Sequence, residues 1–161
     1  MTDVRVGTGL DVHPFADQPR PLVLGGVTVP DGPGLAGHSD ADVVAHAVTD
    51  ALLGALALGD LGSRFGVDTP ELAGADSLAF VRAAVADVRA AGFEVGNVDA
   101  VVVAQRPRLA AHRDDMRRGL AGALGVDLDR VSVKATTTDR LGTIGRGEGI
   151  ACWATVTVAR E

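Results

Sequence analysis

Metal-ligand residue types recur near the beginning of the chain. Asp11 and His13 are separated by one residue in GTGLDVHPF, and His46 follows in an otherwise apolar segment. In an extended chain, residues i and i+2 point to the same side, so the Asp11 carboxylate and the His13 imidazole converge. With His46 they provide two nitrogens and one oxygen, which leaves one tetrahedral position open, as in catalytic zinc sites. This set predicts a zinc centre.

The surroundings of His46 support this interpretation and leave a simpler one open. Asp42, His46 and Asp50 recur every four residues, which places them on one stripe of a predicted helix. Ionisable groups on an apolar helix are costly to desolvate unless they pair or bind a ligand. The two aspartates could orient the imidazoles. The simpler alternative is a solvated helix face, with Asp11 in a turn.

A second chemical segment is ATTTDRLGTIGRGEG, residues 135–149. Threonine hydroxyls and exposed loop N–H groups are natural phosphate partners. Asp139 could hold a hard cation such as Mg²⁺ that bridges phosphates. The alternative is a threonine-rich turn with glycines at strained positions. The glycines precede a strand rather than a helix, which excludes a dinucleotide-binding loop.

Weaker candidates flank these segments. His38 precedes the predicted helix, where unpaired N–H groups bind anions, or it is an exposed loop histidine. The basic segment 105–108 could receive a nucleotide or be a solvated strand exit. Arg146 and Glu148 are expected to form a structural ion pair, and Cys152 to be a small core residue.

Composition limits the class of protein. The 161 residues are 47% hydrophobic but only 3% aromatic, which predicts a single domain with a core of Ala, Val and Leu. The single cysteine allows no internal disulfide. A net charge of −6 argues against nucleic acid as a partner. We find no signal-peptide pattern or membrane-spanning apolar stretch, so we expect a cytoplasmic protein with no membrane partner.

The elements that position these residues alternate between strands and helices. We expect an α+β domain in which helices cover one side of a mixed sheet. Ser39 is the expected N-cap of the long helix, and the apolar run 98–104 suits a strand covered on both faces. The predicted elements are a strand over 4–10, a hairpin over 21–30, a helix over 39–58, an irregular segment over 59–76, a helix from 76–77 to 92, a strand over 98–104, a helix over 109–124, and strands over 131–135 and 150–158.

Several motifs in order resemble those of the 2-C-methyl-D-erythritol 2,4-cyclodiphosphate synthases of the non-mevalonate isoprenoid pathway. The resemblance covers essentially the whole chain, as one synthase domain over residues 1–161. Its blocks are Asp11–His13, His38–Ala55, Ala57–Gly62, Gly74–Ser77, Gly96–Asp99, Lys134–Thr138 and Gly145–Cys152.

The resemblance implies roles for particular residues. Asp11, His13 and His46 would bind zinc, while His38 and Thr137 would stabilise the transition state. Asp139 would bind a second divalent cation, Mg²⁺ or Mn²⁺. The implied substrate-binding residues are Asp11, Val12, His13, His38, Ser39, Asp60, Leu61, Gly62, Ala104, Gln105, Arg106, Pro107, Arg108, Leu109, Ala110, Thr136, Thr137, Thr138, Asp139 and Arg146.

The resemblance also implies a fold, an assembly and a reaction. The family is a homotrimer of ferredoxin-like subunits with active sites between neighbours, and its threefold cavity, lined by residues matching Arg146 and Glu148, can bind isoprenoid diphosphates. The substrate is 4-diphosphocytidyl-2-C-methyl-D-erythritol 2-phosphate, whose 2-phosphate attacks the β-phosphorus and releases CMP. Two competing hypotheses are a ligand-binding trimer without turnover and a zinc phosphohydrolase with a linear product.

Three positions depart from the family pattern. Asp139 stands where the family usually has Glu, so its carboxylate reaches about 1.5 Å less far. The segment from Phe65 to Thr69 differs from the common family sequence, and Thr143 replaces a common aromatic residue. None of these departures touches the expected zinc ligands.

Overall fold

The main sheet of the protein is mixed and has four strands. The computed structural model describes residues 2–30, 32–66 and 73–161. The strand order is β1-β6-β4-β5. β6 is antiparallel to β1 and to β4, whereas β4 and β5 are parallel. The strands are β1 (Asp3–Pro14), β4 (Glu94–Val103), β5 (Val131–Thr136) and β6 (Gly149–Arg160).

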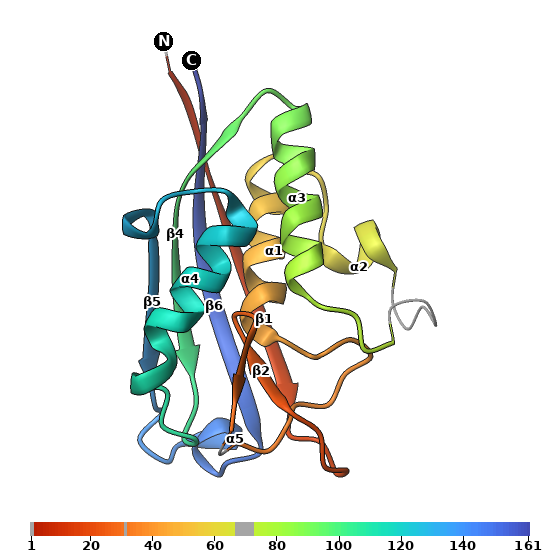
Figure 1. Ribbon diagram of the computed structural model, residues 1–161, viewed down its shortest axis with the longest axis vertical. Helices are drawn as coiled ribbons and strands as arrows, with labels where there is room; N and C mark the ends of the chain where they lie inside the picture. The colour runs from red at the N-terminus through yellow and green to blue at the C-terminus, as the bar shows by residue number, and fades with distance from the viewer. Residues whose placement is uncertain (1, 31, 67–72) are drawn as a thin grey trace.

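Three helices cover one face of this sheet, and both chain ends lie side by side at one end of it (Figure 1). The three covering helices are α1 (Val43–Ala55), α3 (Leu78–Ala90) and α4 (Arg113–Leu124). The α+β class, with helices on one side of a mixed sheet, is confirmed. The smaller elements are the hairpin of β2 (Leu22–Leu24) and β3 (Val27–Val29), the helices α2 (Leu61–Phe65) and α5 (Gly142–Gly145), and the 3₁₀ turns η2 (Ala110–His112) and η3 (Leu128–Arg130).

Glycines in β1 allow helix α1 to approach the sheet very closely. A Cβ atom added to Gly7 would lie 1.9 Å from the Ala51 carbonyl oxygen, and one added to Gly9 would lie 2.0 Å from that of Ala47. The opposing helix residues are alanines, so backbone packs almost directly on backbone. Asp11 follows Gly9 on the same face of β1, and His46 precedes Ala47. The close contact therefore brings the candidate ligands together.

Asp42 joins helix α1 to the β2–β3 hairpin. Its Oδ1 accepts hydrogen bonds from the N–H groups of Val44 and Ala45, so it is the N-cap of α1. Its two carboxylate oxygens also accept the N–H groups of Gly25 and Gly26, at 2.8 and 2.7 Å. Burial raises the pKa of Asp42 to about 6, although these N–H donors act in the opposite direction. The helix that bears His46 is thus anchored at its first turn.

Three predicted boundaries near the site were wrong. The first strand continues to Pro14 because it pairs with β6 as far as Gly149, so Asp11 and His13 lie within it. The long helix begins only at Val43, because Ala41 has a positive φ of 57° and Asp42 provides the cap, and it ends at Ala55. The segment 59–76, predicted to be irregular, contains α2.

Two other predictions need correction. The first turn of the predicted helix over 109–124 is the 3₁₀ turn η2, and α4 starts only at Arg113. In β4, buried side chains alternate with partly exposed ones, so a single chain covers only one of its faces. The uncovered face of the sheet exposes a band of apolar side chains, Val4, Val6, Leu10, Val12 and Trp153, each 54–60% exposed.

The remaining predictions concern the core and the membrane. Cys152 is fully buried among short aliphatic side chains, as predicted, and the alternating residues of β6 from Ile150 to Val158 face this core. Across the described ranges, none of the helices has the length and apolar character that a membrane span needs.

Candidate active site

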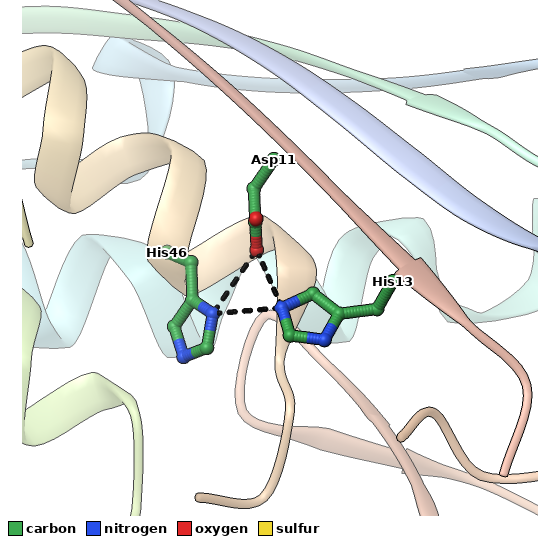
Figure 2. A group of neighbouring side chains, drawn as sticks. All are labelled: Asp11, His13 and His46. Atoms are coloured by element: carbon green, nitrogen blue, oxygen red, sulfur yellow. Dashed lines mark hydrogen bonds and ion pairs between the residues drawn. The ribbon is translucent and has the colours of Figure 1, made fainter. Parts of the chain in front are cut away.

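Asp11, His13 and His46 converge at the C-terminal end of β1, as the sequence predicted (Figure 2). The Asp11 Oδ2 atom lies 2.9 Å from His13 Nε2 and 3.0 Å from His46 Nδ1. The two ring nitrogens are 3.3 Å apart. One oxygen and two nitrogens therefore form a small triangle on the helix-covered face of the sheet.

The donor triangle has the size that zinc requires. Zinc–nitrogen bonds of about 2.0–2.1 Å in a tetrahedron separate neighbouring ligand atoms by about 3.3 Å, close to the observed 2.9–3.3 Å. Among the described residues, this is the only group of three or more His, Cys, Asp or Glu side chains so arranged. With three protein ligands, a fourth position is left for a ligand from outside the chain.

The electrostatics of the triangle suit metal binding. Burial raises the pKa of Asp11, but the hydrogen bonds and charges of His13 and His46 outweigh that effect and hold the pKa below its usual range. Asp11 is therefore ionised at neutral pH. Burial lowers the pKa of His13, whereas the hydrogen bond and charge of Asp11 raise it, with a net increase. A divalent cation would replace the proton that this arrangement favours.

The groups behind the imidazoles differ from the expected aspartates. Asp42 caps α1, and Asp50 accepts the N–H of Leu61 at 2.7 Å, so neither contacts an imidazole of the triangle. Instead, the outer nitrogen of His13, Nδ1, lies 2.6 Å from the Ala36 carbonyl oxygen. The outer nitrogen of His46, Nε2, faces serine hydroxyls. The prediction that Asp42 and Asp50 fix the imidazoles was wrong because their carboxylates bind backbone N–H groups.

A separate pocket of about 220 Å³ opens where β4 and β5 end. It brings together the segment that the sequence linked to a nucleotide and the one that it linked to phosphate. Its lining consists of Ala104, Gln105, Pro107, Arg108, Leu109, Ala110, Ala135, Thr136 and Thr137. Ala135 was missed because an alanine carries no chemical signal in a sequence. Arg106, Thr138 and Asp139, also predicted for this site, lie outside the lining.

Comparison with known proteins assigns the chain to a family. A family model described as the YgbB family matches residues 4–159. The chain belongs to the YgbB family. Proteins named 2-C-methyl-D-erythritol 2,4-cyclodiphosphate synthase from Burkholderia thailandensis and Burkholderia lata are 54% and 52% identical to it over 159 residues, which is 99% of this chain and 98% of each relative.

Solved structures agree with this assignment to the YgbB family. The bifunctional IspDF from Campylobacter jejuni is 42% identical, with a TM-score of 0.94 over 100% of this chain, although this chain spans only 43% of that larger one. The CDP complex of IspF from Plasmodium falciparum is 32% identical, with a TM-score of 0.85 over 98% of this chain and 97% of that one.

Other predicted site residues of this YgbB chain lie on several elements. The Val12 side chain lies on the uncovered face, opposite Asp11 and His13, because side chains alternate along a strand. Asp60 caps α2 by accepting the Ser63 N–H at 2.7 Å, and Leu61 and Gly62 form its first turn. Of the segment from Phe65 to Thr69, residues 67–69 lie outside the described residues.

Asp139 and Arg146 of the 135–149 segment both have partners close by in the sequence. Thr137 Oγ1 donates to Asp139 Oδ1 at 3.3 Å and accepts the Asp139 N–H at 3.1 Å. Arg146 Nε lies 2.5 Å from Glu148 Oε1, which confirms the predicted ion pair. Asp139 is thus presented on a structured turn, but it is not part of the Asp11–His13–His46 triangle.

Within one YgbB chain, the triangle and the pocket lie at the same end of the sheet but near opposite edges. His13 pairs with Ile150 of β6, and Val103 pairs with both Ala151 of β6 and Thr136 of β5. β1 and β5 are three strand spacings apart in the sheet order, about 14 Å at the usual spacing. One chain therefore separates its metal-compatible site from the pocket at the ends of β4 and β5.

Proposed function

We propose that this chain is a 2-C-methyl-D-erythritol 2,4-cyclodiphosphate synthase acting on 4-diphosphocytidyl-2-C-methyl-D-erythritol 2-phosphate. The observation that carries this proposal is the Asp11–His13–His46 triangle, in a chain that matches the named synthases over nearly its full length. A 2-phosphate oxygen forms a bond to the β-phosphorus, and the bond from that phosphorus to the bridging oxygen breaks. The bridging oxygen leaves with CMP, and the cyclic diphosphate remains.

The residues of the site would act by binding and orientation. The attacking phosphate is ionised at neutral pH, so no strong general base is required. Asp11, His13 and His46 would hold zinc, which supplies positive charge to the diphosphate oxygens when bound. His38 and Thr137 would stabilise the transition state by contacting phosphate oxygens, with Ser39 beside the 2-phosphate. The main contribution is to fold the substrate so that its two phosphate groups meet.

The exposed Asp139 carboxylate suits a second divalent cation. Mg²⁺ and Mn²⁺ prefer oxygen ligands, and Mg²⁺ is often held by one or two carboxylates together with substrate phosphates. Asp139 offers such a carboxylate on the turn that also presents the Thr137 hydroxyl. Because the side chain is shorter than the usual Glu, a water molecule could bridge the carboxylate to the cation.

The remaining substrate contacts are assigned from the positions of the candidate residues in the fold. Asp60, Leu61 and Gly62 would hold the erythritol part, and the pocket formed by segments 104–110 and 135–137 would hold the cytidine. Val12 could contribute through its backbone only, since its side chain lies on the uncovered face. Arg106, Thr138 and Asp139 would contact the diphosphate outside the pocket lining.

We further propose a homotrimer of ferredoxin-like subunits with active sites between neighbours. The band of Val4, Val6, Leu10, Val12 and Trp153 on the uncovered sheet face is an apolar surface of the kind that marks subunit contacts. The separation of triangle and pocket within one chain also supports this, because a neighbour could bring its pocket beside the triangle.

Three other expectations stay predictions. The whole chain, residues 1–161, is expected to act as one synthase domain. An isoprenoid diphosphate could bind in a threefold cavity beside Arg146, which has an exposed guanidinium paired only locally with Glu148 among the contacts described. A cytoplasmic location is expected from the sequence.

Phosphorus NMR of the reaction tests the proposed function. The diphosphocytidyl substrate is incubated with the metal-loaded protein, and with the same protein after chelation. We expect CMP and the cyclic diphosphate to appear together, only with metal, and to reappear when zinc and Mg²⁺ are restored. CMP with a linear product would instead identify a hydrolase. Substrate binding without turnover by metal-loaded protein would identify a ligand-binding protein.

A variant of the pocket tests where the cytidine binds. Ala135→Phe introduces a bulky ring into a cavity of about 220 Å³, whereas Ala135 itself is exposed. We expect KM to rise at least about tenfold, with calorimetric binding of CMP weakened in parallel, because the ring and the base compete for the same volume.

The matched control is Ala86→Phe on the exposed side of α3. It should leave KM and CMP binding unchanged. Normal CMP binding by Ala135→Phe would contradict the assignment of this pocket to the nucleotide.

A further inference from the structure

A chain of polar side chains lies behind His46, on the side away from Asp11 and His13. Ser77, at the N-terminus of α3, is fully buried, and its Oγ lies 3.0 Å from His46 Nε2. The same hydroxyl contacts Asp40 Oδ1 in the loop before α1. Three residues from three separate segments thus form a carboxylate–hydroxyl–imidazole sequence of contacts.

The chemistry of the three groups sets the direction of the hydrogen bonds. A carboxylate can only accept, so the single hydrogen of the Ser77 hydroxyl is donated to Asp40. The Ser77 oxygen is then left with lone pairs and accepts a hydrogen from His46 Nε2. With its proton on Nε2, His46 would offer the lone pair of Nδ1 to a cation in the triangle; Nδ1 lies 3.0 Å from Asp11 Oδ2.

Asp40 is itself held in place by backbone donors. Its Oδ2 accepts the Ser77 N–H at 3.0 Å, and its Oδ1 accepts the Asp42 N–H at 3.1 Å. These bonds fix the Asp40 carboxylate before any ligand binds.

Ser39 is a further neighbour of His46. Its Oγ lies 3.2 Å from both His46 Nε2 and Ser77 Oγ, and it accepts the Ala41 N–H.

The two histidines of the triangle are oriented by different kinds of hydrogen-bond acceptor. His13 Nδ1 donates to the Ala36 carbonyl, a backbone acceptor that no side-chain substitution removes. His46 depends on side chains: Ser77 is the nearer hydroxyl and Ser39 the farther one. Asp40, which accepts from Ser77, lies 37 positions before it in sequence. Only the His46 arrangement can therefore be changed by mutation without touching a ligand.

We propose that Asp40 and Ser77 are positioning residues of the metal site. Their hydrogen-bonded chain keeps the proton of His46 on Nε2 and directs Nδ1 toward the cation. Partners of this kind raise the basicity of a ligating imidazole and fix its ring orientation. This inference rests on the metal site in the proposed function, and it concerns residues to which neither the sequence nor the family resemblance assigned a role.

A double-mutant cycle on zinc affinity tests the proposal. Zinc dissociation constants are measured by chelator competition for the wild type, Ser77→Ala, Asp40→Asn and the double variant. We expect each single variant to bind zinc about 10- to 100-fold more weakly. The double variant should be no weaker than the weaker single variant, because Asp40 acts through the Ser77 hydroxyl.

A purely structural role for Asp40 predicts a different result. The Asp40 bonds to the Ser77 and Asp42 N–H groups persist in Ser77→Ala, so a structural effect of Asp40→Asn would add to that of Ser77→Ala. Additive losses, or unchanged affinity in Ser77→Ala, would overturn the proposal. The visible spectrum of the Co²⁺-loaded proteins gives a second readout, since a misdirected His46 alters the coordination geometry.

Asp76→Asn is the matched control. Asp76 precedes Ser77 and binds the Leu78 N–H and Arg82, but has no contact with His46 among those described. The zinc affinity of this variant should equal that of the wild type. A loss of zinc affinity as large as that of Ser77→Ala would contradict the proposed roles of Asp40 and Ser77. A wild-type protein that binds no zinc would refute the metal site itself, an outcome distinct from failure of the cycle.

Discussion

Replacing His46 with alanine should remove bound zinc and synthase activity together. The triangle provides three donors, and two remaining donors bind zinc too weakly to hold it through purification. Loss of groups that merely orient a ligand costs about 10- to 100-fold in affinity or activity, so loss of the ligand itself should cost more than about 100-fold. The checks are metal content by mass spectrometry and phosphorus NMR of the reaction.

The fold should survive this change. The His46 side chain, 12% exposed, lies in the site and outside the hydrophobic core, whereas the fully buried side chains of α1, such as Val44, Val48 and Leu52, are untouched. Circular dichroism should therefore show native helix content. His112→Ala, in the separate turn η2, is the control and should keep zinc and activity. Stoichiometric zinc in the His46→Ala protein would refute the ligand assignment.

Replacing Gly9 with alanine should destabilise the protein strongly. The added Cβ would lie 2.0 Å from the Ala47 carbonyl oxygen and 2.9 Å from the Ala51 nitrogen. Both are backbone atoms of α1, so no side-chain rotation can relieve the overlap. Overpacking commonly costs 1–3 kcal/mol, and a clash with rigid backbone belongs at or above the upper end, about 3 kcal/mol. Urea denaturation measures the loss in free energy of unfolding.

The same change should weaken the metal site, because α1 must move away from β1. Ala47 follows His46 directly, and Asp11 lies two residues beyond Gly9 on the same face. Zinc affinity should therefore fall even where Gly9→Ala remains folded. Gly122→Ala in α4 is the control, since no heavy atom lies within 4 Å of its added Cβ. Alanine there should add up to about 1 kcal/mol of stability. Equal stability of the two variants would contradict the close-packing argument.

The metal-compatible cluster was predictable from the sequence in part because two of its members lie close together in the chain. Asp11 and His13 alternate on one strand, and their convergence follows from the two-residue period of extended backbone. His46 was selected as an imidazole between Asp42 and Asp50 on the polar stripe of an otherwise apolar helix. The pocket at the ends of β4 and β5 was predictable in part, since polar and basic residues mark the ends of two strands. Ala135, which completes its lining, has no distinguishing side chain.

Residue types and their spacing along the chain thus account for the α+β class, the Ala- and Val-rich core, the Asp11–His13–His46 cluster and the family. They could not predict which hydrogen-bond donor each aspartate contacts. Asp42 and Asp50 suit the helical period, yet their carboxylates bind backbone N–H groups, whereas Asp40 faces the hydroxyl behind His46. Spacing reports only which residues share a face of one element. The partner of a carboxylate is chosen by the packing of α1, α3 and the hairpin, which brings together atoms remote in sequence.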